Sequence, residues 1–113
     1  MGKLEEMSKK RIQSHKKLLA LKSKVYERFL EMEKAAFGEG EVPKKYKELI
    51  AVGISVVINC ESCMQWHIEQ AARSGASESE ILEAIEVGME MGGGPATVSS
   101  RFALDVMESV FRR

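Results

Sequence analysis

Both cysteines of the 113-residue chain lie in one short stretch, in which two residues separate Cys60 from Cys63. His67 follows four positions after Cys63. If this stretch is helical, the three side chains share one face, because residues three, four and seven positions apart are neighbours on a helix surface. Two thiols within disulfide reach, together with an imidazole that can take a proton, are the parts of a dithiol redox site.

The start of this helix favours the charged form of a thiol. We expect Asn59 to be the N-cap, so that Cys60 lies in the first turn, where free backbone N–H groups and the helix dipole stabilise a thiolate. His67, one turn beyond Cys63, can exchange a proton with that thiol. The helix start therefore favours Cys60 as the attacking thiol, whereas the nearby imidazole favours Cys63.

A Cys-x-x-Cys pair also occurs in metal sites and as two inert buried thiols. Structural zinc normally takes four nitrogen or sulfur ligands, and Cys60, Cys63 and His67 supply three. A catalytic zinc with an open position could use these three, with or without Glu48, but ligands spaced along one helix would have to converge on one ion. The local pattern thus favours a redox dithiol, and we expect no metal or other cofactor.

Glu48 lies twelve residues before Cys60, near the start of an apolar segment. One interpretation is a solvated carboxylate at the start of a helix, where the dipole favours negative charge. The other places it in the site, where it would orient His67 and stabilise the charged imidazole, as in other arrangements of nucleophile, base and orienting group.

The composition limits the class of protein. The 17 basic and 17 acidic residues balance to zero net charge, which does not indicate nucleic-acid binding. No secretory signal and no long uncharged apolar run is found, so we expect a soluble, cytoplasmic protein that does not bind membranes. In such a protein two cysteines are more often catalytic or metal-binding than structural.

Apolar residues recur every three or four positions, which predicts an all-α fold of about five helices. One long helix is expected over residues 3–36, and residues 1–37 form an N-terminal helical extension of a single domain over residues 1–113. Ser77 and Glu80 match a capping box, and Gly75 suits a helix C-terminus. The other helices are expected over residues 43–58, 60–73, 78–91 and 95–111.

The helix expected over residues 43–58 is apolar on nearly all sides. A helix of that kind is buried on most of its surface, and a chain of this size has few other helices with which to cover it. We therefore expect a homo-oligomer.

Glu48, then eleven residues, then Cys60-x-x-Cys63-x-x-x-His67 and the segment over residues 71–81 resemble the alkylhydroperoxidase D-like branch of the carboxymuconolactone decarboxylase superfamily. The resemblance covers about residues 43–110. It implies an all-α antioxidant enzyme, usually a homotrimer or homohexamer. These four residues would then carry out thiol-dependent peroxide reduction or thiol–disulfide exchange, with a Glu–His proton relay. The implied partners are a lipoyl protein, a thioredoxin-like protein or a peroxiredoxin.

The sequence departs from the family pattern at one position of the site. Ser62 stands where alkylhydroperoxidase D itself has a second histidine, so the proton relay would be shorter. The decarboxylase branch typically lacks the paired cysteines, which argues against decarboxylation. With the family pattern added to the position of His67, we take Cys63 as the attacking thiol and Cys60 as the resolving one. The alternatives are a non-catalytic oligomeric module that senses redox state or binds metal, and a decarboxylase-type enzyme.

Overall fold

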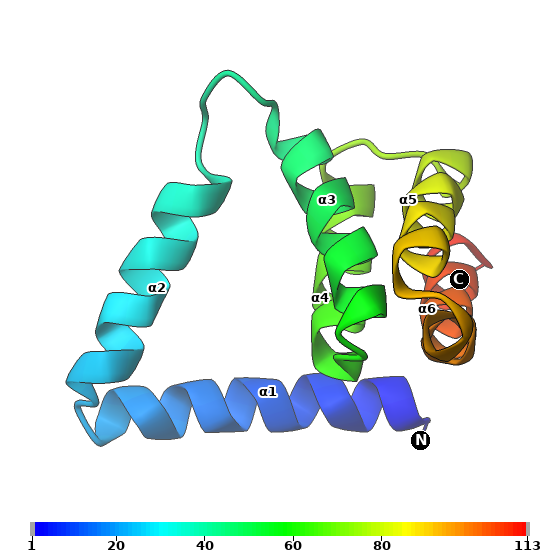
Figure 1. The fold of residues 1–113 in the computed structure, drawn as a ribbon. Helices are drawn as coiled ribbons and strands as arrows, with labels where there is room; N and C mark the ends of the chain where they lie inside the picture. Colours follow the sequence, from blue (N-terminus) through cyan, green and yellow to red (C-terminus); the bar gives the residue numbers. More distant parts are fainter. Residues whose placement is uncertain (1, 113) are drawn as a thin grey trace. The chain divides into compact units, whose positions relative to one another are not determined.

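The computed structural model describes residues 2–112, which form six α-helices and contain no strand (Figure 1). The prediction of an all-α fold is confirmed. None of the helices in this part of the chain is both long enough and apolar enough to cross a membrane. The chain divides into two compact units, Met1–Gly38 and Glu39–Arg113.

The N-terminal unit consists of α1 (Lys3–Ala20) and α2 (Lys24–Phe37), joined by a tight turn (Figure 1). The prediction of one helix over residues 3–36 is wrong at this turn. Lys22 has a φ of 55°, in the left-handed region, which ends the helical hydrogen bonding of α1. Ser23 then caps α2, because its hydroxyl oxygen accepts a backbone N–H of the first turn at 3.2 Å. The sequence predicted about five helices, and the described residues form six because the first predicted helix is divided in two.

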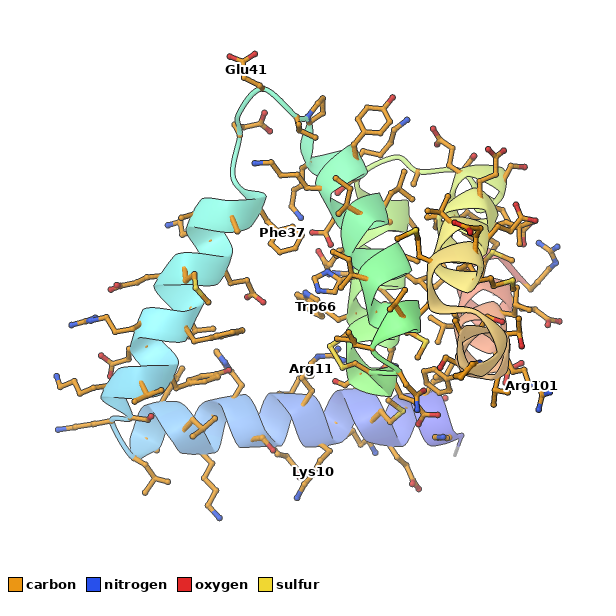
Figure 2. All side chains as sticks on the ribbon, viewed as in Figure 1. Lys10, Arg11, Phe37, Glu41, Trp66 and Arg101 are labelled. Carbon is orange, nitrogen blue, oxygen red and sulfur yellow. A yellow bond between two sulfur atoms is a disulfide. The ribbon has the colours of Figure 1, made fainter. Side chains whose placement is uncertain are left out.

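The two helices of this unit also meet through side chains. His15 Nδ1 lies 2.6 Å from the hydroxyl of Tyr26, and the two rings meet edge to face with their centres 5.5 Å apart. Many other side chains of α1 are polar and exposed, and Lys10 is one of those that project from the helix (Figure 2).

The C-terminal unit is a bundle of four helices around one core (Figure 1). In this bundle α3 packs against α4 and α5, and α6 packs against the same two helices. All four contribute buried apolar side chains, among them Val52, Met64, Ile85 and Val106. Their bounds agree with the predicted ranges within one residue at each end: α3 (Lys44–Val57), α4 (Glu61–Arg73), α5 (Glu78–Gly92) and α6 (Gly94–Arg112).

The turn between α4 and α5 has the predicted signals. Gly75 follows the end of α4 with a φ of 96°, a conformation that glycine adopts without strain. Ser77 and Glu80 form the predicted capping box, in which the Glu80 carboxylate accepts the Ser77 N–H at 2.9 Å and the Ser77 hydroxyl accepts the Glu80 N–H at 3.1 Å. Lys45 of α3 donates to the same carboxylate at 3.0 Å. These contacts fix the start of α5 beside the start of α3.

Further along, α3 and α5 approach each other closely at two glycines. A Cβ atom at Gly88 would lie 2.8 Å from the carbonyl oxygen of Gly53 and 3.1 Å from Cβ of Val56. Both distances are shorter than ordinary van der Waals contact, so the separation of the two helices depends on the missing side chain at Gly88.

Candidate active site

The turn between α3 and α4 places both cysteines at the start of α4. Asn59 has a φ of 54°, a left-handed conformation that asparagine tolerates better than most residues. Cys60, and not Asn59, is the N-cap of α4, and its Sγ accepts the backbone N–H of Cys63 at 3.2 Å. The predicted cap was therefore wrong by one residue, because Asn59 completes the turn after α3. The Cys60 N–H donates to the carbonyl of Ser55 at 3.0 Å, which holds the turn against the end of α3.

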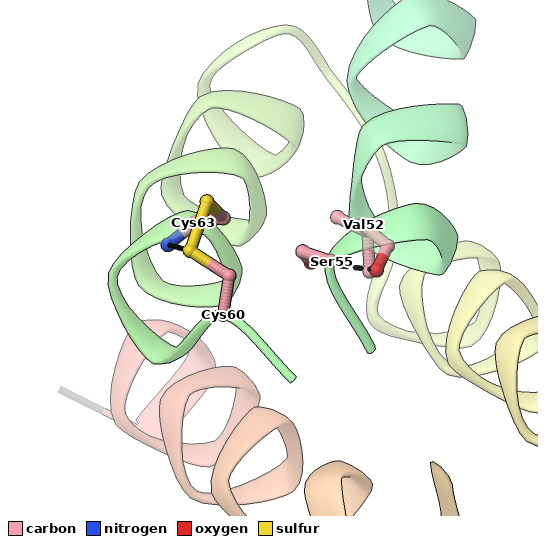
Figure 3. Close-up of a disulfide and its surroundings, with 4 residues drawn as sticks. All are labelled: Val52, Ser55, Cys60 and Cys63. Atoms are coloured by element: carbon pink, nitrogen blue, oxygen red, sulfur yellow. Dashed lines mark hydrogen bonds between the residues drawn. A yellow bond between two sulfur atoms is a disulfide. The ribbon is translucent and has the colours of Figure 1, made fainter. Parts of the chain in front are cut away.

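Cys60 and Cys63 are joined by a disulfide, with Cα atoms 5.2 Å apart (Figure 3). Both residues are partly exposed. The last turns of α3 lie opposite the disulfide, where the buried Ser55 hydroxyl donates to the carbonyl of Val52 at 2.7 Å. The Ser55 proton is thus held within α3 and is not directed at a sulfur atom.

Glu48 of α3 and His67 of α4 are brought together by the packing of these two helices. Oε1 of Glu48 lies 2.7 Å from Nδ1 of His67, and Oε2 accepts from Nζ of Lys44 at 2.6 Å. Glu48 is 1% exposed, while the His67 side chain retains 16% of its accessibility. A buried carboxylate needs such partners, because burial without them costs several kcal/mol. The interpretation of Glu48 as a solvated carboxylate is therefore wrong.

His67 lies one turn beyond Cys63 in α4, so the two side chains are neighbours on the helix surface. Its Nδ1 is held by Glu48, which restricts the orientation of the ring. The fold thus brings Glu48 into contact with His67 and places the disulfide at the start of the same helix as His67. Their catalytic roles remain a prediction.

One residue of this cluster was missed in the sequence. Lys44 precedes Glu48 by four positions, a spacing at which oppositely charged side chains meet on a helix. That spacing was the available signal, but exposed pairs of this kind are common and carry little information. Here the pair matters because Glu48 is buried.

The alternative interpretation of the cysteines, a zinc site, requires a set of ligands close to one another. Among residues 2–112, no group of three or more His, Cys, Asp or Glu side chains is placed to hold a metal ion. Both sulfur atoms are bonded to each other instead. Trp66, next to His67 on α4, is partly exposed (Figure 2).

Sequence comparisons identify one family. The model of the carboxymuconolactone decarboxylase family matches residues 23–106. Uncharacterized protein 4 in the cox locus of Paracoccus denitrificans is 38% identical over 82 residues, which cover 73% of this chain and 74% of that protein. An uncharacterized protein of Cupriavidus necator is 36% identical over 77 residues, which cover 68% of each chain.

Solved structures of similar fold belong to the same family. The apo form of a carboxymuconolactone decarboxylase family protein from Legionella pneumophila has a TM-score of 0.90 at 28% identity and is matched over 96% of both chains. Two crystal structures of TM1620 from Thermotoga maritima have TM-scores of 0.88 and 0.87 at 26% and 25% identity. They cover 95% of this chain, and 94% and 91% of their own. TM1620 has been suggested to be involved in an antioxidative response.

Proposed function

Since the chain belongs to the carboxymuconolactone decarboxylase family, we propose that it is an oxidoreductase of the alkylhydroperoxidase D-like kind. It acts as a thiol-dependent peroxidase or disulfide reductase. The observation that carries the proposal is a disulfide at a helix start, one turn from an imidazole that is hydrogen-bonded to a buried carboxylate. The antioxidative response suggested for TM1620 supports the same chemistry.

In the reduced protein, Cys63 is the attacking thiol. His67 takes its proton, and the thiolate attacks the terminal oxygen of a peroxide. The O–O bond breaks, the sulfur becomes a sulfenic acid, and the leaving alkoxide takes the proton to form an alcohol. Cys60 then attacks the sulfenic sulfur, and the displaced hydroxide leaves as water with the Cys60 proton. One peroxide and two thiols thus become one alcohol, one water and one disulfide.

A dithiol donor returns the protein to its reduced form. One donor thiolate attacks Sγ of Cys63, and Cys60 leaves as a thiolate. The backbone N–H of Cys63, which lies 3.2 Å from Sγ of Cys60, would stabilise that leaving group. The second donor thiol then attacks the mixed disulfide, leaves the donor oxidised and releases Cys63. A lipoyl or thioredoxin-like protein has the required dithiol, and a peroxiredoxin disulfide is a substrate that could replace the peroxide.

Glu48 acts through His67 in this scheme. Its carboxylate holds the ring and offsets the positive charge that His67 gains with the cysteine proton. Lys44, bonded to the other carboxylate oxygen, holds Glu48 in place.

The enzyme further acts as a homo-oligomer, a trimer or a hexamer. The physical support is the outer side of α3, where Ile50 and Ile54 remain 56% and 55% exposed in the single chain. A mass equal to that of one chain, 12.6 kDa, in light scattering at micromolar concentration would contradict it.

Turnover distinguishes the enzyme from a redox sensor. The purified protein would be mixed with cumene hydroperoxide and with dihydrolipoamide as donor, and peroxide loss would be followed over many equivalents. An enzyme consumes peroxide continuously and passes through a form that is two hydrogens lighter in mass spectrometry. A protein that forms the disulfide once and is not reduced by the dithiol would be a sensor, and the proposal would fail.

A further inference from the structure

The turn between α3 and α4 ends one helix and starts the next at a single residue. Asn59, with a φ of 54°, turns the backbone after α3 in the left-handed region. Its N–H donates to the carbonyl of Val56 at 3.3 Å, and the N–H of Cys60 donates to the carbonyl of Ser55 at 3.0 Å. These two bonds form a Schellman motif, in which the left-handed residue is usually glycine. Cys60 therefore completes the C-terminus of α3 and also caps α4.

The turn between α1 and α2 repeats this geometry with a serine in place of the cysteine. Lys22 has a φ of 55°, and its N–H donates to the carbonyl three residues back at 3.0 Å. The N–H of Ser23 donates to the carbonyl five residues back at 3.2 Å. The Ser23 hydroxyl accepts the N–H of Tyr26 at 3.2 Å, and Sγ of Cys60 accepts the N–H three residues ahead at the same distance. The same cap position is thus filled by serine in one turn and by a redox-active residue in the other.

Both turns depend on a left-handed residue that is not glycine. Asparagine tolerates this conformation better than most residues, and β-branched residues tolerate it worst. At the end of α4 the corresponding residue is Gly75, with a φ of 96°. The side chain of Asn59 is exposed, so its replacement removes no buried packing. A substitution of Asn59 therefore acts mainly on the conformational cost of the turn.

The cost of this turn affects the two redox states differently. In the oxidised protein the disulfide ties Cys60 to Cys63, with their Cα atoms 5.2 Å apart. In the reduced protein this covalent link is absent, and the turn and the cap hold Cys60 at the start of α4. A strained turn can then open and carry Cys60 away from Cys63. The ease of the turn thus sets the effective concentration of one thiol beside the other.

We propose that Asn59 is a positioning residue of the dithiol. Its left-handed backbone holds Cys60 at the cap of α4, within reach of Cys63, before the disulfide forms. The inference rests on the proposed dithiol function and specifies its resolving step. In that step the placement shortens the lifetime of the sulfenic acid on Cys63, because the second thiol is already in position. The same placement also stabilises the disulfide in an equilibrium that needs no peroxide.

Equilibrium with a small dithiol measures this placement in the full chain. The protein would be incubated with mixtures of reduced and oxidised dithiothreitol, and alkylation followed by mass spectrometry would give its oxidised fraction. Each disulfide formed passes two electrons and two protons from the protein thiols to oxidised dithiothreitol. Asn59→Val should lower the equilibrium constant for the disulfide by about 5- to 30-fold, which corresponds to about 1–2 kcal/mol for a disfavoured left-handed residue. Asn59→Gly should match or exceed the wild type.

Lys22→Val is the matched control, because it places the same residue in the same turn geometry within the N-terminal unit. It should lower the free energy of unfolding in urea and leave the equilibrium constant for the disulfide unchanged. Circular dichroism checks that each variant is folded. Asn59→Ala, which lacks the branched side chain, replaces the valine variant if that variant is unfolded.

Peroxide gives a second measurement of the same placement. After one equivalent of cumene hydroperoxide, dimedone should label a larger fraction of Asn59→Val than of the wild type, because the sulfenic acid persists for longer. Asn59→Gly should be labelled no more than the wild type.

Three results would overturn the inference. Equal equilibrium constants for Asn59→Val and the wild type would show that the turn does not hold the thiol. An equal loss in Asn59→Gly would assign the effect to the asparagine side chain and not to the backbone. An equal loss in Lys22→Val would assign it to general destabilisation. A protein that shows the expected order of equilibrium constants but no peroxide turnover would support the role of Asn59 and contradict the proposed peroxidase function.

Discussion

The carboxylate of Glu48 lies 2.7 Å from Nδ1 of His67, and this contact joins α3 to α4. Glu48 is buried and is also bonded to Lys44, so its position is set by two helices and by a second charge. The imidazole is therefore held by a buried carboxylate, one helical turn from a cysteine of the disulfide. In the proposed mechanism, this contact holds the imidazole that takes the cysteine proton.

The first prediction concerns this pair. His67→Gln should slow peroxide or disulfide turnover near neutral pH by about 10²–10⁴-fold, the range typical of general-base catalysis. Glu48→Gln should have the same effect more weakly, because the imidazole remains. At high pH the thiol ionises without help, so much of both deficits should disappear. Stopped-flow rates from neutral to alkaline pH would measure this.

His15→Gln is the matched control for these rates. His15 is the other histidine of the chain and contacts Tyr26 in the N-terminal unit. Its loss should leave the rates unchanged. Wild-type rates at neutral pH in both site variants would rule out the relay.

The second prediction separates the two cysteines. In Cys60→Ser the attacking Cys63 remains, so one equivalent of peroxide should be consumed and a sulfenic acid should accumulate. In Cys63→Ser the residue beside His67 is lost, and reaction with peroxide should be slower than in Cys60→Ser. Mass spectrometry after treatment with dimedone, which labels sulfenic acids, would measure both. A sulfenic acid that forms faster on Cys60 would reverse the assignment.

The fold of the C-terminal unit could be predicted because its helix boundaries have local causes. Ser77 and Glu80 form a cap that depends on four consecutive residues, and Gly75 adopts a conformation that few other residues favour. The break between α1 and α2 has one local signal, the N-cap serine Ser23, which serine's frequent occurrence elsewhere in helices makes weak. The break depends on a left-handed Lys22, a conformation that the residue type does not favour.

The candidate site was predictable to a similar extent. Cys60, Cys63 and His67 lie in one segment, so their spacing alone places them on one face. The burial of Glu48 and its contact with His67 depend on how α3 packs against α4. Periodicity identifies the apolar face of a helix but does not specify which residue of a neighbouring helix it meets.

The third prediction concerns pH and the start of α5. The Ser77 N–H and the Lys45 ammonium lower the pKa of Glu80 below its ordinary value of 4.5. A group with a lowered pKa stabilises the fold above its ordinary pKa, and this contribution is lost as the pH falls through the lowered value. The free energy of unfolding of the wild type, measured in urea, should therefore fall on acidification. That of Glu80→Gln should fall less.

Lys45, which donates to Glu80, affects stability at alkaline pH instead. The hydrogen bond to Glu80 raises the pKa of Lys45 above 10.5. The contribution of Lys45 to stability is present below pH 10.5 and is lost as the pH rises through the raised value.

Glu83→Gln is the control for Glu80→Gln, because Glu83 is an exposed glutamate of the same helix. If Glu83→Gln reduced the loss of stability at acidic pH as much as Glu80→Gln does, the contacts of Glu80 in the capping box would not be the cause of that loss.

The last prediction tests the close approach of α3 and α5. An alanine Cβ at Gly88 would lie 2.8 Å from the backbone oxygen of Gly53, and a backbone atom can move only if α3 moves with it. Such overpacking costs about 1–3 kcal/mol, which exceeds the gain of about 0.5–1 kcal/mol from replacing a helical glycine with alanine. Gly88→Ala should therefore lower the free energy of unfolding in urea. At Gly94, the first residue of α6, a Cβ would meet nothing within 4 Å, so Gly94→Ala should be neutral or stabilising. Equal stability of the two variants would mean that α3 and α5 can separate at no cost, and that their glycines do not set the distance between them.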